Sequence, residues 1–255
     1  IWAIGISMVV LAGLVWLPRW AILAIALLMI GGHNALDGYH GSGWLWQLLH
    51  VQGPINYGYG RMLMVIYPLV PWVGVMAAGY CLGSVMAMEE RQRNRILYTI
   101  GLGAIALFIV LRAINGYGDP EHWAVQGAWH HTILSFVNCT KYPPSLLYLL
   151  MTLGPAIAAL PLLERWHGAV GRVMTVYGRV PLFYYVMHIY LIHSMALVVD
   201  AVLYPGEAVG VFQHPGYSLP VVHLCWLIAV AILYLPCRWY MRIKQNHRKW
   251  WLSYL

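Results

Sequence analysis

Histidine, asparagine and aspartate stand together near the end of one apolar run. His33 and Asn34 are followed by Asp37, and positions 33 and 37 are four residues apart. Residues at this spacing share one face of a helix, so we expect the Asp37 carboxylate to pair with the His33 imidazole. Such a pair orients the ring for acid–base chemistry or for binding a polar ligand. The alternative is a helix-terminal cap whose side chains are simply solvated.

A second polar group precedes a later apolar run. Residues 138–145 read Asn-Cys-Thr-Lys-Tyr-Pro-Pro-Ser, and proline is favourable in the first turn of a helix, so we expect a helix to begin here. Lys141 invites an anionic ligand or partner. His188 lies within another apolar run, where an ionisable residue is a functional hypothesis by default. A hydrogen-bonded contact between helices is the alternative for His188.

The composition places these groups in a membrane protein. Of 255 residues, 61% are hydrophobic and 9% are charged, whereas a soluble domain carries roughly 25% charged residues. We therefore predict an all-α polytopic bundle in the lipid bilayer, with residues 1–255 forming a single transmembrane domain. The net charge of +7 does not indicate nucleic acid, because the basic residues lie in short loops between apolar runs. The four cysteines form no CxxC pair, so we expect no metal site.

About seven apolar runs are candidates for membrane-spanning helices. An amphipathic segment at about 165–179 is expected on the membrane surface. Gly79 and Gly83 are spaced for a close helix contact. The predicted spans are 1–17, 20–36, 62–87, 96–114, 145–163, 181–203 and 219–240.

The loops between these runs predict an orientation. One set of alternate loops, together with the C-terminal tail, carries twelve basic residues, and the other set carries three: Arg61, Arg112 and Lys141. The positive-inside rule places the first set and the tail in the cytoplasm. The chain opens at Ile1 within an apolar run and without an initiator Met, so we interpret it as a fragment that lacks its N-terminal helices.

Three blocks of the sequence resemble a known family. They are residues 67–83 (YPLVPWVGVMAAGYCLG), 138–147 (NCTKYPPSLL) and 178–188 (GRVPLFYYVMH). Their order and spacing are similar to those of bacterial members of the heparan-α-glucosaminide N-acetyltransferase-like family, within the wider group of membrane acyltransferases. The resemblance implies transfer of an acetyl or other acyl group from cytoplasmic acyl-CoA, such as acetyl-CoA, to an extracytoplasmic sugar amine or hydroxyl. It also implies a bacterial inner membrane.

The resemblance suggests substrate-binding residues, and the sequence departs from the family pattern in one respect. By matching blocks, Lys141, Tyr142, Ser145 and His188 are carried over as candidates for substrate binding, beside His33, Asn34 and Asp37 from the residues alone. The family's catalytic histidine lies in N-terminal helices beside Arg-Gly and Asp-His motifs, which do not occur here. We therefore expect the catalytic base to precede residue 1, so that this segment alone would not acylate a substrate.

Two other classes of membrane protein stay open. A transporter or flippase would share a polar outer surface and buried histidines. An inverted repeat would favour a transporter, but the three blocks have no similar counterpart in the other half of the chain. A non-catalytic membrane subunit is the second alternative. The sequence also leaves open whether the protein forms a homo-oligomer.

Overall fold

The computed structural model describes residues 2–39, 41, 43–58, 60–166, 168–203 and 218–246. The fold is predominantly helical, and six helices are long and apolar enough to cross a membrane, which confirms an all-α polytopic membrane protein. The chain divides into two compact units, Ile1–Leu162 and Leu163–Leu255, and each is described by itself. The single domain expected from the sequence stays a prediction.

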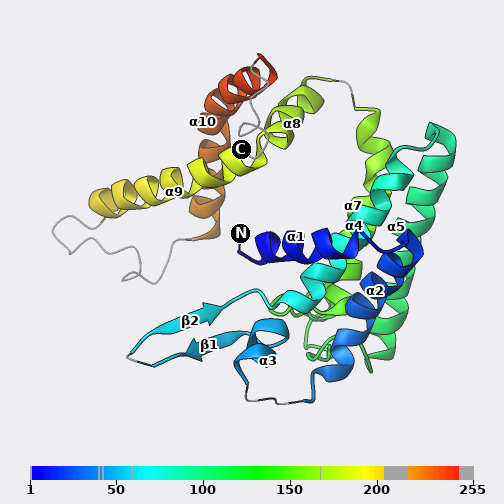
Figure 1. The fold of residues 1–255 in the computed structure, drawn as a ribbon. Coiled ribbons are helices and arrows are strands. Elements are labelled where there is room, and N and C mark those ends of the chain that lie inside the picture. The colour runs from blue at the N-terminus through cyan, green and yellow to red at the C-terminus, as the bar shows by residue number, and fades with distance from the viewer. Residues whose placement is uncertain are drawn as a thin grey trace. The chain divides into compact units, whose positions relative to one another are not determined.

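Unit 1 contains seven α-helices, one 3₁₀ helix (η1) and one β-hairpin within its described residues (Figure 1). The helix α2 begins directly after Pro18, and α5 ends where Asn115 adopts a left-handed conformation, with φ of 56°. The elements are α1(Trp2–Leu14), α2(Arg19–Gly32), η1(His33–Leu36), α3(Trp44–Leu49), β1(Gly53–Asn56), β2(Met62–Val65), α4(Leu69–Met86), α5(Glu90–Ile114), α6(Trp129–Val137) and α7(Leu146–Glu164).

Two predicted spans differ from the structure. The first is a helix of 13 residues, Trp2–Leu14, about 20 Å long at 1.5 Å per residue, which is shorter than the roughly 30 Å hydrocarbon core. The third was predicted to begin at residue 62, but Met62–Val65 is a strand that pairs antiparallel with Gly53–Asn56. The helix α4 begins only at Leu69, because Pro68 before it holds an extended conformation.

Small residues set the closest helix contacts of unit 1. A Cβ added at Gly101 of α5 would lie 2.5 Å from the backbone nitrogen of Ala158 in α7, and one at Gly74 of α4 would lie 3.1 Å from the carbonyl of Ala26 in α2. The close contact predicted for Gly79 and Gly83 is not present among the described residues, where added Cβ atoms would meet open space. Side chains larger than that of glycine are therefore disfavoured at these positions of the α5–α7 and α2–α4 crossings.

The helices of unit 1 bring their polar termini together. Asn34, just past the end of α2, binds the backbone N–H of Leu146 at the start of α7. Arg112, near the end of α5, binds the segment that leads to α7. Tyr67, just before α4, contacts Tyr142. We call this region, formed by the ends of α2 and α5 and the starts of α4 and α7, the polar end of unit 1.

Unit 2 consists of α8(Ala169–Arg179), α9(Pro181–Leu203) and α10(Leu219–Asn246) in its described part (Figure 1). Its core joins Val180, at the start of α9, to Leu233 and Cys237 of α10. The Tyr177 hydroxyl of α8 donates to the Val230 carbonyl at 2.6 Å. The predicted amphipathic segment at 165–179 thus contains a separate short helix that packs on α10.

Candidate functional site

An aspartate–histidine pair lies at the polar end of unit 1. The Nε2 atom of His50 is 3.2 Å from an Asp37 carboxylate oxygen, and His50 is only 4% exposed. Burial lowers the pKa of His50, an effect that the Asp37 charge opposes. Since the carboxylate accepts the Nε2 proton, the neutral ring presents a lone pair on Nδ1. The carboxylate predicted to pair with His33 therefore orients His50 instead.

His33 is committed to backbone contacts. Its Nδ1 atom lies 2.9 Å from the Ile30 carbonyl and its Nε2 atom lies 3.0 Å from the Pro144 carbonyl. The side chain is 2% exposed. It faces Pro144 because α2 ends at Gly32 and the chain continues as η1, which turns residue 33 away from Asp37. His33 thus connects the end of α2 to the segment before α7, with both nitrogens at carbonyl oxygens.

Asn34 and Ser145 position the start of α7. The Asn34 side chain donates to Asp37 at 2.7 Å and accepts from the Leu146 N–H at 2.8 Å. The Ser145 hydroxyl accepts from the Tyr148 N–H at 3.0 Å, which is the contact of a helix N-cap. These two candidate binding residues therefore use their polar atoms to fix the helix terminus and the Asp37 carboxylate.

Asp119 organises the loop before α7. Its carboxylate accepts hydrogen bonds from the Ser145 hydroxyl at 2.6 Å and from both the backbone N–H and the hydroxyl of Thr140 at 2.9 Å. It also accepts from the Glu121 N–H at 2.9 Å. The residue is 8% exposed, so this buried charge is satisfied by four donors.

Arg112 holds the same loop from the other side. The side chain is 1% exposed, and its guanidinium donates four hydrogen bonds to backbone carbonyls. A planar guanidinium suits this role because its donors point in several fixed directions. The acceptors are the carbonyls of Glu121, Ser135, Phe136 and Asn138, at 2.7–3.2 Å.

Lys141 and Tyr142 present polar groups at the surface of the polar end. The Lys141 ammonium lies 5.2 Å from the centre of the Tyr142 ring, and the hydroxyls of Tyr142 and Tyr67 are 3.4 Å apart. The hydrogen bond to Tyr67 and the nearby Lys141 lower the pKa of Tyr142, and Tyr142 in turn raises the pKa of Lys141. Lys141 is therefore a cation at neutral pH, which suits binding of an anionic or hydroxyl-rich group.

Cys139 lies within this loop and is half-buried. Burial raises the pKa of its thiol to about 11. The reactive form of cysteine is the thiolate, which this shift disfavours at neutral pH. Cys139 is therefore poorly suited to carry an acyl group as a thioester.

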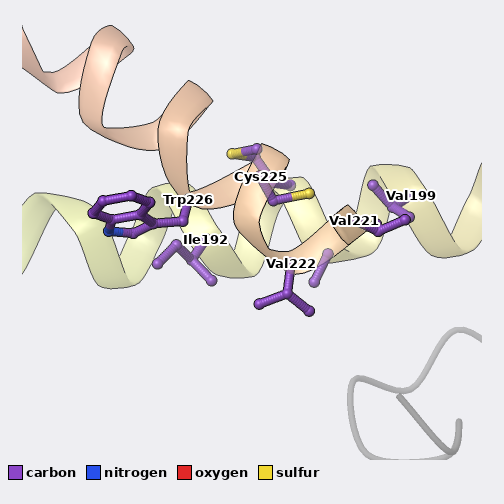
Figure 2. A pocket seen from close by; sticks show the side chains of 8 residues that line it. Ile192, Val199, Val221, Val222, Cys225 and Trp226 are labelled. Carbon is purple, nitrogen blue, oxygen red and sulfur yellow. The ribbon is translucent and has the colours of Figure 1, made fainter. Parts of the chain in front are cut away.

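Unit 2 holds His188 and an apolar cavity. The His188 ring stacks on Tyr184 with centres 5.5 Å apart, and its Nδ1 lies 3.2 Å from the Tyr184 carbonyl. Its part in a site with the residues of unit 1 stays a prediction. Figure 2 shows the cavity between α9 and α10, about 310 Å³ and lined by aliphatic side chains with Cys225 and Trp226. This lining offers contacts to hydrocarbon but not to a polar substrate.

Six of the seven predicted binding residues thus lie at one end of one unit. Sequence reasoning missed His50, Asp119 and Arg112, which orient or hold them. His50 carried a local signal, because it ends a short apolar segment and adjoins Gly-rich sequence. Asp119 and Arg112 had no such signal, since their partners lie in other segments of the chain.

Comparison with known proteins supports the family resemblance. Residues 1–113 match the family model described as heparan-alpha-glucosaminide N-acetyltransferase, catalytic. The matched part contains the block at 67–83 together with the Asp37–His50 pair, and the blocks at 138–147 and 178–188 follow it. No curated protein and no solved structure matches the chain. Residues 1–113 are thus similar to the heparan-α-glucosaminide N-acetyltransferase family of membrane acetyltransferases, which supports the resemblance drawn from the sequence.

Proposed function

We propose that the protein transfers an acetyl or other acyl group from cytoplasmic acyl-CoA to a sugar amine or hydroxyl on the other side of the membrane. The observation that carries this proposal is the match of residues 1–113 to the catalytic region of an acetyltransferase family. The identity of the catalytic base stays a prediction. The residues present here would bind and orient the sugar.

The polar end of unit 1 supports a role in acceptor binding. It combines an exposed cation, Lys141, with the hydroxyls of Tyr67 and Tyr142 and with the oriented imidazole of His50. Carbohydrates carry many hydroxyl donors and acceptors, so a site with a cation, phenols and an imidazole suits them. A sugar amine or hydroxyl bound here would be held by hydrogen bonds rather than by apolar contacts.

The opposite end of α5 supports a role in donor binding. Arg91 and Arg95 are exposed near its start, whereas Arg112 lies near its other end. Arg112 lies 21 positions after Arg91, a rise of about 31 Å along the helix, which is close to the thickness of the hydrocarbon core. Arginine forms charge-assisted hydrogen bonds with phosphate, so this basic end suits the phosphates of CoA on the cytoplasmic side.

The proposal is tested with the full-length protein in detergent, supplied with acetyl-CoA and glucosamine. We expect CoA thiol release to match formation of N-acetylglucosamine in a ratio of one to one. Heat-denatured protein serves as the control. Uptake of unmodified sugar into vesicles, without acetylation, would favour a transporter; inactivity toward amino and neutral sugars alike would favour a non-catalytic subunit.

A further inference from the structure

The short helix α3 carries two buried polar atoms that lack partners among the described residues. They are the indole Nε1 of Trp46, which is a donor, and the Nδ1 of His50, which is an acceptor in the tautomer that Asp37 fixes. A buried polar atom without a hydrogen bond costs free energy, and such atoms in native proteins call for an explanation. The helix α3 has six residues and His50 is its C-terminal cap. Two unpaired polar atoms in so short a segment indicate a missing partner.

The two atoms are complementary to the same kind of polar group. Trp46 and His50 are four residues apart at the end of α3, and their ring centres are 4.7 Å apart. A hydroxyl or neutral amine both accepts and donates a hydrogen bond. A ligand with such groups can therefore accept from the indole N–H and donate to the imidazole lone pair.

Neighbouring side chains hold both rings in place. Tyr39 packs edge-on against Trp46 with ring centres 4.9 Å apart. Asp37 holds the far nitrogen of His50 and is itself held by Asn34. The titratable groups that face His50 are Asp37 and His33, whose ring centre is 6.2 Å away. The donor and the acceptor are thus presented by oriented rings, as a specific binding site requires.

We infer that α3 forms the acceptor subsite, in which the His50 Nδ1 accepts a hydrogen bond from a sugar hydroxyl or amine and the Trp46 Nε1 donates one to it. This inference rests on the proposed function and adds the residues that recognise the sugar. Both atoms are covered in the present packing, so binding of the sugar requires α3 to shift from its contacts with α4 and β1.

The test compares three variants of the full-length protein with acetyl-CoA and glucosamine as substrates. Trp46→Phe removes the indole N–H and keeps an aromatic ring, and His50→Gln removes the imidazole lone pair. Loss of one hydrogen bond predicts a KM for glucosamine that is raised about fivefold to tenfold in each, with the KM for acetyl-CoA unchanged. Trp129→Phe is the matched control, because Trp129 is 76% exposed on α6; we expect it to behave like the wild type.

A second measurement separates this inference from the proposed function. Glucosamine binding is measured by calorimetry without acetyl-CoA. If the wild type binds glucosamine but does not acetylate it, the proposed function fails, and weaker binding by Trp46→Phe and His50→Gln still supports the subsite. Glucosamine affinities or KM values equal to those of Trp129→Phe overturn the inference, as does a wild type that neither binds nor acetylates glucosamine. Equal melting temperatures of the variants establish that a lowered affinity is not caused by misfolding.

Discussion

Replacing Arg112 by lysine tests whether the polar end of unit 1 is held by a buried guanidinium. Arg112 donates four hydrogen bonds to backbone carbonyls between residues 121 and 138. Lysine keeps the positive charge but offers three donors from a single nitrogen atom. It cannot reproduce the separate directions of the guanidinium nitrogens, so we expect two of the four carbonyls to lose their donors.

The expected loss follows from those two carbonyls. Leaving a buried polar group without its partner costs about 1–3 kcal/mol. Because the loop is close to the surface and can admit water, we take the lower end, which gives about 2 kcal/mol for Arg112→Lys. That value corresponds to a melting temperature lower by roughly 4–8 °C for a chain of this size. Arg112→Met removes all four donors and should cost about 4 kcal/mol on the same basis.

The assay is thermal unfolding in detergent, combined with hydrogen exchange of residues 119–140. We expect Arg112→Lys to melt earlier and to exchange faster in that loop. Arg95→Lys is the control, because Arg95 lies on the same helix but is exposed. If Arg112→Lys melts and exchanges like Arg95→Lys, the guanidinium contacts do not hold the loop and the reasoning is wrong.

Three further predictions address the same unit. Ser145→Ala removes the N-cap of α7 and one donor to Asp119, so we expect a loss of about 1 kcal/mol or more in unfolding free energy, measured by chemical denaturation. Gly101→Val places bulk against Ala158, and we expect lower yield and melting temperature, whereas an unchanged melting temperature would contradict the close α5–α7 crossing. Because burial lowers the pKa of His50, the stability that depends on its neutral form should be fully present above about pH 6.5. It should be lost as the pH falls through the lowered pKa, so the melting temperature of His50→Gln should fall less on acidification than that of the wild type.

The helices could be predicted because their signal is local. Runs of about 20 apolar residues bounded by proline or charged residues predict membrane-spanning helices. The structure has long apolar helices at six of the seven predicted positions. The hairpin could not be predicted in this way. Residues 62–65 are apolar and continue into the run of α4, and an apolar segment of four residues does not distinguish a strand from a helix.

The site could be predicted only where its residues are close in the sequence. His33, Asn34 and Asp37 were recognised as a group, but the partner of Asp37 is His50, 13 residues away beyond α3. Asn34 binds the N–H of a residue 112 positions later. Such pairings depend on how α2 and α7 pack, which neither spacing nor composition specifies.

Acyl transfer across the membrane can be tested by a sided assay in proteoliposomes. Full-length protein is reconstituted and its orientation is determined by protease access to the loop at residues 87–89. Labelled acetyl-CoA is then supplied on the side of Arg91 and Arg95, and glucosamine on the side of Lys141. We expect labelled N-acetylglucosamine on the Lys141 side, and none when acetyl-CoA is supplied only on that side. Product that forms only when both substrates are on one side, or no product in either arrangement, would contradict this expectation.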